Sequence, residues 1–399
     1  MSTTVVSERW TTARLGWLFQ PISDRGHEDA MVLSVYRDHG VIPKDSRTDN
    51  FNRTPENLSN YQLVRPGDLV VNRMKAWQGS LGISEYEGIV SPDYEVLRPI
   101  TPGYDYRFVH SLLRSRGLID QYALRSTGIR PSQWRLYWDE MKTIEVSLPS
   151  AGEQRAIADY LDRETARIDT LIEEQERLIE LLHERRHSLI DGVFDSQPVN
   201  TRLQNACTDV VDCPHTTPEV AEDGVYEAVR TASVRNGKFR PGNGLPVSAE
   251  TWEARNAGGA PSVGDVLFTR EAPAGEACMV PNEQICLGQR MVLLRIDDAV
   301  CVGKFLLWQI YSDRVQDHFL LSANGSTVAN VRLPILRTTP IWLPSLAEQR
   351  QIVAYLDEQT SKIDKLVVEA ERFIELSRER RSALITAAVT GQIDVRRVA

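Results

Sequence analysis

A stretch near the middle of the chain recurs near its end, at a constant offset of 195 residues. The first copy begins at Leu148 and the second at Leu343, and 25 of the 43 aligned positions are identical without a gap. An internal repeat constrains the architecture before any local pattern does, because each copy has to fold in the same way. The repeat therefore predicts a chain of two similar halves, each a variable block followed by a repeated segment.

Each repeated segment predicts a long helix. Both begin with a Ser-x-x-Glu capping box, at Ser150 and at Ser345, directly after a proline. Beyond the first turn, glycine and proline are absent until Gly192 in one copy and Gly391 in the other. About 40 residues per helix would span roughly 60 Å at 1.5 Å per residue. A helix of this length needs a packing partner, since propensity alone does not hold it.

Apolar residues follow both segments with the 3.5-residue spacing of a coiled coil. Arg186 and Arg381 are among the polar residues that interrupt the lines. The spacing predicts that the two helices pack on each other, antiparallel if a pseudo-two-fold axis relates the halves, with spare apolar surface for other subunits. The alternative is that each helix lies on its own globular block. The predicted lines contain Thr165, Ile168, Ile172, Gln175, Ile179, Leu182, Arg186, Leu189 and Val193, and Thr360, Ile363, Val367, Ala370, Ile374, Ser377, Arg381, Leu384 and Ala388, with Leu161, Leu171, Leu178, Leu356, Leu366 and Phe373 beside them.

The two variable blocks resemble each other only faintly. Gly67-Asp68 and Gly264-Asp265 each predict a turn, followed by a buried strand that ends in Arg73 or Arg270. We expect four segments: globular blocks at 1–147 and 199–342, and helices at 148–198 and 343–399. The predicted class is α/β (α+β), with two globular domains separated by two long helices that form an antiparallel coiled coil. Similar helices that carry dissimilar globular blocks are typical of a protein that binds two different targets on one scaffold.

The bulk composition favours a protein of the cytosol. No apolar run approaches the roughly 18 residues of a membrane span, and the first ten residues lack the pattern of a signal peptide. Five cysteines without framework spacing fit reduced thiols. The net charge of −9 argues against a uniformly basic nucleic-acid binder, yet residues 148–198 alone carry 12 acidic and 6 basic residues. A local basic face elsewhere is therefore compatible with the composition.

Two basic clusters are candidates for such a face. A cluster interleaved with aromatic residues lies between residues 107 and 137, and a second surrounds Asn236-Gly237. Arginine in loops can clamp phosphates or donate in pairs to guanine, but a solvated basic face is an equally simple interpretation. The clusters contain Arg107, Arg114, Arg116, Arg125, Arg130 and Arg135 with Tyr122, Trp134 and Tyr137, and then Arg230, Arg235, Lys238 and Arg240.

Catalytic and metal motifs are weak. We find no Walker loop, no G-x-G-x-x-G after a strand and no Pro-Pro pair of the kind that amino-methyltransferases carry. The spacings of the cysteines match no common zinc knuckle, and we predict no metal site. A loose nuclease-like pattern is most simply a coincidence. One i, i+4 histidine pair is most simply part of a solvated helix face. The residues concerned are Cys207, Cys213 and His215, Cys278 and Cys286, Pro92-Asp93 with Glu140-Met141-Lys142, and His183 with His187.

Taken together, these features resemble the DNA-specificity subunit of type I restriction–modification systems, over nearly the whole chain. The most specific mark is the Leu-Pro-x-x-x-Glu-Gln-x-x-Ile entry to each helix, at 148–157 and 343–352. The ending 387–394 is also similar to the family. Stretches 66–70 and 72–79 resemble one variant of its recognition domain, and 212–218 followed by 229–231 resembles another. This resemblance assigns Cys213 and His215 to a domain motif rather than to zinc.

The resemblance implies two target recognition domains, each reading one half of a split, asymmetric site in double-stranded DNA, with the helices as a spacer. It also implies docking of two modification (methyltransferase) subunits on the helices and of restriction subunits in the full nuclease. The chain itself would have no catalytic residue and no cofactor. S-adenosylmethionine, ATP and Mg²⁺ would belong to the partners.

On this resemblance, basic side chains hold phosphates and loop side chains read base edges in the major groove. Two alternatives stay open, namely the specificity subunit of a fused restriction–methylation enzyme and a coiled-coil scaffold without nucleic acid. An enzyme in its own right is opposed by the missing motifs. The candidate DNA-binding residues are Arg73, Lys75, Arg125, Arg130, Gln133 and Arg135 in the first block, and Arg230, Arg235, Lys238, Arg270 and Arg332 in the second.

Overall fold

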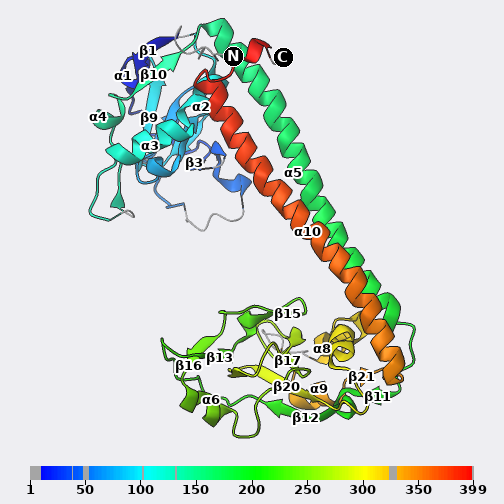
Figure 1. Ribbon diagram of the computed structural model, residues 1–399. Coiled ribbons are helices and arrows are strands. Elements are labelled where there is room, and N and C mark those ends of the chain that lie inside the picture. The colour runs from blue at the N-terminus through cyan, green and yellow to red at the C-terminus, as the bar shows by residue number, and fades with distance from the viewer. Residues whose placement is uncertain are drawn as a thin grey trace. The chain divides into compact units, whose positions relative to one another are not determined.

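The structure is a computed structural model that describes residues 10–37, 39–47, 54–100, 103–130, 133–322 and 330–397. The chain forms two compact units (Figure 1): unit 1 is Met1–Gln175 with Arg372–Ala399, and unit 2 is Glu176–Glu371. Each unit contains one globular domain and one half of each long helix. Among the described residues, no helix is both long and apolar enough to cross a bilayer.

The two predicted helices are α5 (Ala151–Phe194) and α10 (Leu346–Val389), of 44 residues each. Both start directly after the predicted serine. The serine hydroxyl accepts from the backbone N–H of the glutamate three residues later, at 3.4 Å in both copies. This is one half of a capping box.

The helices pair antiparallel, as the contacts inside each unit show (Figure 1). In unit 1 the start of α5, at Ile157, shares a core with Ala388 near the end of α10. In unit 2 the end of α5, at Ile190, shares a core with Leu356 near the start of α10. The predicted pairing of the helices is therefore confirmed. The buried positions of the two lines include Leu161, Ile168, Ile172, Leu182, Leu356, Thr360, Ile363, Ala370 and Ile374.

One part of the helix prediction is wrong. Leu171, Leu178, Leu366 and Phe373, which we expected beside the packed lines, are between 37% and 48% exposed. Their positions fall outside the narrow seam of two helices that pack in a strict heptad pattern. They remain as apolar surface on the helix pair.

The globular domain of unit 1 is built on a four-stranded antiparallel sheet in the order β2-β9-β6-β7. Its helices α2 and α3 contribute Phe108, Leu113 and Tyr122 to the core between the sheet and the start of α5. The bounds are β1 (Thr11–Arg14), α1 (Leu15–Leu18), β2 (Phe19–Pro21), β3 (Leu33–Tyr36), β4 (Gly40–Pro43), β5 (Gln62–Val64), β6 (Leu69–Asn72), β7 (Leu81–Ile83), β8 (Gly88–Val90), β9 (Tyr94–Pro99), α2 (Tyr106–Leu113), α3 (Arg116–Arg125), α4 (Trp138–Met141) and β10 (Glu145–Leu148).

The globular domain of unit 2 repeats this plan, with a four-stranded antiparallel sheet in the order β12-β20-β17-β18. A second sheet, β16-β13-β19, includes one parallel pair. The bounds are β11 (Thr201–Arg202), β12 (Cys207–Asp212), β13 (Tyr226–Val229), β14 (Val234–Arg235), β15 (Lys238–Phe239), β16 (Leu245–Val247), α6 (Ala249–Arg255), β17 (Val266–Thr269), β18 (Ala277–Met279), β19 (Ile285–Leu287), β20 (Met291–Ile296), α7 (Gly303–Ile310), α8 (Asp313–Ser322), α9 (Leu333–Thr338) and β21 (Pro340–Ile341).

A buried glutamine joins each domain to its helix. Gln154 accepts from the backbone N–H of Asp105 (3.0 Å), the residue that caps α2, and donates to the Pro149 carbonyl (2.9 Å). In the second copy Gln349 accepts from Val302 N–H (2.8 Å), at the start of α7. These contacts explain the glutamine of the repeated motif, because its side-chain amide forms hydrogen bonds with backbone groups of two elements at once.

Candidate nucleic-acid interface

In each domain, the loop that follows α3 or α8 returns to the same place, the arginine at the end of the central strand. The carbonyl of Arg73 accepts from Leu136 N–H at 2.9 Å, and the carbonyl of Arg270 accepts from Val331 N–H at 3.0 Å. Both arginines follow the strands that the Gly-Asp turns predicted. This backbone contact is therefore a shared feature of two domains that differ in sequence.

The side chains of these two arginines are used inside their domains. Arg73 donates to the carbonyl of Asp93 (3.1 Å) and lies 3.6 Å from the carboxylate of Glu95. Arg270 donates to both carboxylate oxygens of Asp212, at 2.8 and 2.9 Å, with only 16% of its side chain exposed. Because their donors are occupied, we assign both side chains a structural role: Arg73 binds the segment 92–95, and Arg270 binds Asp212 and the carbonyl of Val331. Whether either also contacts DNA stays a prediction.

The loop of unit 1 has a rigid base. Thr127 and Arg135 exchange two backbone hydrogen bonds, at 3.0 and 2.9 Å, and Gln133 N–H donates to the carbonyl of Arg130 at 2.8 Å. Trp134 packs edge-on against Trp77, with ring centroids 5.4 Å apart. A supported loop of this kind can hold its side chains in a fixed position for a partner.

This loop presents basic side chains without acidic partners. Arg130 and Gln133 are exposed, as is Lys75, which stands before the short helix Ala76–Gln78. Arg125 donates to the side chain of Gln121 at 2.5 Å. Within the described residues, none of the ion pairs involves Lys75 or the arginines of this loop. We call this set of side chains the first basic surface: Lys75, Arg125, Arg130, Gln133 and Arg135.

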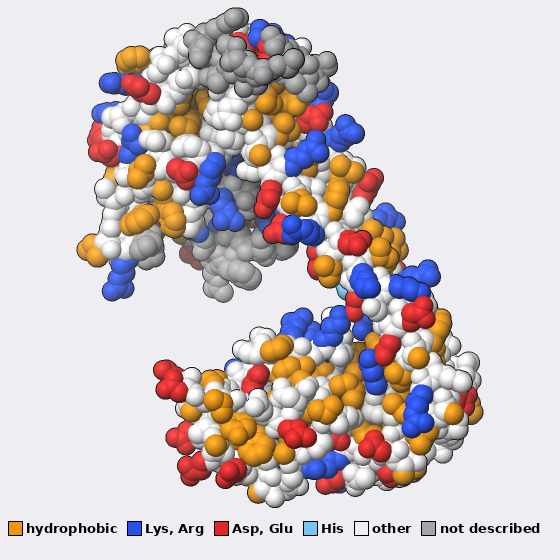
Figure 2. Space-filling view, viewed as in Figure 1, with side chains coloured by type: hydrophobic (Ala, Val, Ile, Leu, Met, Phe, Trp, Pro, Cys, Tyr) orange, Lys and Arg blue, Asp and Glu red, His pale blue; other side chains and the backbone are white. Residues whose placement is uncertain are grey.

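The basic cluster of unit 2 contains both residues that form ion pairs and residues that do not, within the described part of the chain. Arg230 and Arg332 are exposed and make no ion pair with the described part of the chain. Arg235, in contrast, lies 3.6 Å from Glu276, and Lys238 lies 2.5 Å from Asp364 of α10. Figure 2 shows Lys and Arg side chains gathered over β15, next to the helices of this unit. The loop after α8 falls outside the described residues between 322 and 330.

Arg107, which the sequence placed in the first basic cluster, instead binds the domain to α5. Its guanidinium donates to Asp159 (2.9 Å) and Asp162 (2.7 Å). Hydrogen bonds with Asp105 first, and then with Asp159 and Asp162, raise the pKa of Arg107. Lys304 makes the matching contact in unit 2, with Asp357 at 2.7 Å. The acidity of the helices is thus partly neutralised by the domains that lie on them.

Within the part of the chain that the structure describes, the cysteines and histidines considered above do not come together as a zinc site. Cys213 is buried, whereas His215 is largely exposed and lies 3.5 Å from Asp212. Burial raises the pKa of the Cys207, Cys278 and Cys301 thiols to about 12, which keeps them protonated and unreactive.

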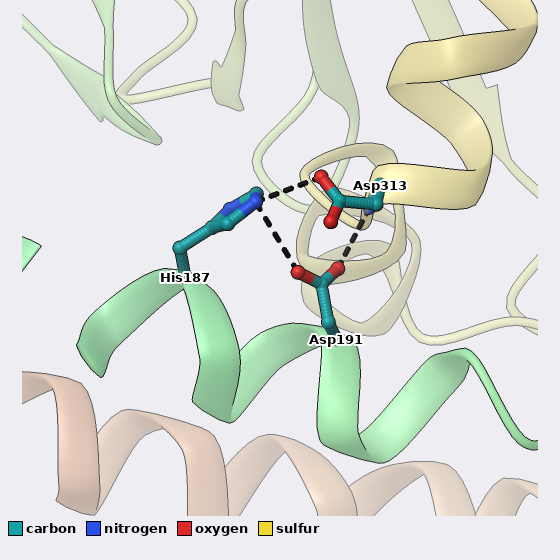
Figure 3. Close-up of side chains that lie close together, drawn as sticks. All are labelled: His187, Asp191 and Asp313. Carbon is teal, nitrogen blue, oxygen red and sulfur yellow. Dashed lines mark hydrogen bonds and ion pairs between the residues drawn. The ribbon is translucent and has the colours of Figure 1, made fainter. Parts of the chain in front are cut away.

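A cluster that the sequence did not indicate joins α5 to the first turn of α8 (Figure 3). His187 Nε2 lies 2.7 Å from Asp313 Oδ1 and 3.2 Å from Asp191 Oδ2, and Asp191 Oδ1 accepts from Asp313 N–H at 2.7 Å. Their ligand atoms lie within 4.8 Å of one another, so a cation could be held here. The three groups already satisfy one another, and we interpret the cluster as a contact between helices. Burial raises the pKa of Asp191, opposed by the Asp313 N–H and His187.

Comparison with known proteins finds one family model that matches part of the chain, and solved structures with a similar fold. Residues 212–368 match the family model described as type I restriction modification DNA specificity domain. The HsdS subunit from Thermoanaerobacter tengcongensis is 20% identical, with a TM-score of 0.54 over 96% of this chain and 97% of that one. A chain from a structure on complex assembly and conformational transition of the type I R-M system is 18% identical, with a TM-score of 0.72 over 96% and 98%. No curated protein sequence matches.

Proposed function

Because residues 212–368 match the family model of the type I restriction modification DNA specificity domain, we propose that the chain is the subunit that selects the DNA sequence in a type I restriction–modification enzyme. Each of its two globular domains reads one half of a bipartite, asymmetric site in double-stranded DNA. The complex works in the cytosol.

The observation that carries this proposal is the shared plan of two domains with unlike sequences. Both have the same four-stranded order and the same pair of helices after the sheet, and in both a residue just before the next helix, Leu136 or Val331, donates to the carbonyl of Arg73 or Arg270. A repeated frame with divergent loops suits two readers that recognise different sequences. Two weak recognitions held together also bind more tightly and more selectively than either one alone.

The first basic surface supplies the DNA contacts of unit 1. Lys75, Arg125, Arg130 and Arg135 neutralise phosphates, which gives affinity and fixes the register on the duplex. Gln133 is placed to read a base edge, since an amide both donates and accepts. In unit 2 the exposed side chains of Arg230 and Arg332 make the corresponding contacts with phosphates.

The helix pair docks two modification subunits, and it does so through apolar surface that both units share. Unit 1 exposes Leu171, Phe373 and Leu376, while unit 2 exposes the repeat equivalents Leu366, Leu178 and Leu181, all between 37% and 51%. Exposed aliphatic and aromatic side chains on one helix face are typical of a protein interface. We assign methylation with S-adenosylmethionine to these partners, and ATP- and Mg²⁺-dependent cleavage to restriction subunits that join the complex.

Target mapping tests the proposal. The chain is combined with its modification subunits, and methylation is sequenced on a library of random duplexes. We expect one bipartite motif, and we expect that changing Arg125, Arg130 and Arg135 to Ala weakens selection of one half only. Equal methylation of all duplexes would refute the proposal. As a matched control, changing the exposed helix arginines Arg163, Arg167 and Arg177 to Ala removes the same charge away from the domains.

A further inference from the structure

The hairpin β14–β15 in unit 2 carries basic residues that the sequence assigned to DNA, but the tip of the hairpin faces other elements of the same unit. Its two-residue turn is Asn236-Gly237, with φ values of 52° and 80°. These values belong to a type I′ turn, for which Asn-Gly is the preferred sequence. The turn is therefore a defined structure and not a loose loop.

The backbone of this turn is held by a partly buried tyrosine. Gly237 N–H donates to the Tyr311 hydroxyl at 2.8 Å, and this hydroxyl donates to the Glu276 carboxylate at 2.7 Å. The same carboxylate accepts from Asn236 N–H at 2.7 Å. Burial, reinforced by Glu276, raises the pKa of Tyr311, so the hydroxyl stays a donor.

The tip of the hairpin contacts both long helices. Lys238 Nζ lies 2.5 Å from Asp364 Oδ2 on α10, and Arg186 of α5 donates to the Asn236 carbonyl at 3.4 Å. The Arg186 guanidinium also lies over the Trp308 ring of α7, 5.4 Å from its centre. The tip of the hairpin is thus connected to α5, α7 and α10 within unit 2.

The internal repeat supplies a natural comparison. Asp364 and Arg186 are the repeat equivalents of Asp169 and Arg381. In unit 1 Arg381 donates to Asp169 at 2.8 and 3.2 Å, whereas in unit 2 the distance from Arg186 to Asp364 is 3.8 Å. The shorter contact of Asp364 is with Lys238. Among the described residues of unit 1, no cation besides Arg381 pairs with Asp169.

We propose that the hairpin β14–β15 is a strut that fixes the second globular domain on the helices of its unit, with Lys238 and Asp364 as positioning residues for the spacing of the two DNA half-sites. This inference rests on the proposed function. An exposed ion pair contributes little stability by itself. Its effect here is geometric, because a domain that can rotate on its support accepts half-sites at more than one spacing.

The test compares Lys238→Met and Asp364→Asn in the complex with modification subunits. Affinity is measured on duplexes that carry the mapped target and on duplexes with the half-sites moved by one base pair. We expect the preference for the native spacing to fall by about three- to tenfold, while affinity for the native site changes by less than about twofold. Exchange of the Asn236 and Gly237 amides, followed by mass spectrometry without DNA, should become faster in both variants.

Two controls separate this role from others. Arg240→Met removes a charge from the same segment without touching the strut, and Asp169→Asn removes the repeat equivalent of Asp364; both should keep the spacing preference. The double variant Lys238→Asp with Asp364→Lys should restore it.

An unchanged preference in Lys238→Met and Asp364→Asn would overturn the inference. So would an equal loss of affinity at all spacings in Lys238→Met alone, which would make Lys238 a phosphate contact. A wild-type complex that binds all sequences equally would instead overturn the proposed function, and with it the strut.

Discussion

Arg381 donates to Asp169 at 2.8 and 3.2 Å, and the repeat places the same two residue types at Arg186 and Asp364, which face each other in the other unit. The aspartate of the first copy thus meets the arginine of the second, and the aspartate of the second copy meets the arginine of the first. Such reciprocal contacts are the rule of a two-fold interface. The arginines that interrupt the apolar lines therefore help to fix the register in which the two helices pack. A helix pair shifted by one turn would leave both unpaired.

Removing one of these pairs should change stability only slightly. Asp169→Asn is expected to lower the free energy of unfolding by about 1 kcal/mol or less, because both side chains are near half exposed and water screens the pair. Urea unfolding at low and at high salt measures this, and the difference from wild type should shrink at high salt. A loss that is large and independent of salt would contradict the assignment.

The glutamines that join domain and helix should matter more. Gln349→Leu removes the hydrogen bonds to the Val302 N–H and the Val300 carbonyl, both in partly buried surroundings, at an expected cost of about 1–3 kcal/mol for the two bonds together. Thermal unfolding of the whole chain measures the loss. Gln351→Leu, at an exposed position of the same helix, is the control and should unfold like wild type.

The helices could be predicted from sequence because their signals are local and periodic. The cap at Ser150, the absence of helix breakers and the heptad spacing all act within one segment. The error at Leu178 and Phe373 has the same origin, since periodicity shows that a face is apolar but not which molecule covers it. The pairing direction required contacts between distant parts of the chain.

The candidate site was less predictable, because the sequence shows charge but not its partners. Arg130 and Arg270 are the same residue type, yet Arg130 is exposed on a loop, whereas Arg270 is bound by Asp212, 58 positions away along the chain. The same applies to Lys238, whose partner Asp364 lies on α10. Only the fold decides which cation is free to meet DNA.

This difference between free and occupied arginines is testable. Arg270→Ala removes two hydrogen bonds to a carboxylate and should destabilise the chain by about 1.5–3 kcal/mol. Arg332→Ala should leave the unfolding midpoint unchanged and weaken DNA binding about equally across sequences. Urea unfolding and filter binding, both applied to the two variants, give the comparison. Equal stability of the two variants would contradict the structural role of Arg270.

Stability should depend on pH through His110. Burial, with Arg114 nearby, lowers its pKa from 6.5 to about 4, and Ile83 N–H donates to its Nδ1 at 3.2 Å. Between pH 6.5 and about 4 the unfolded chain binds a proton that the native chain does not, so stability falls as pH falls through this window. His110→Gln should reduce the slope of unfolding free energy against pH. His183→Gln, exposed on α5, should retain the full slope.

The apolar surface of the helices leads to a prediction about stoichiometry. Phe373→Glu with Leu376→Glu places charges on the surface of unit 1, and Leu178→Glu with Leu181→Glu does the same at the equivalent positions of unit 2. On the proposed function we expect wild type to bind two modification subunits and each double variant to bind one, because burying an unpaired carboxylate in an interface is strongly unfavourable. Native mass spectrometry of the complexes gives the count directly. Glu176→Gln with Arg177→Gln, at exposed polar positions of α5, should still bind two. If both double variants also bound two subunits, the partners would have to dock elsewhere on the chain.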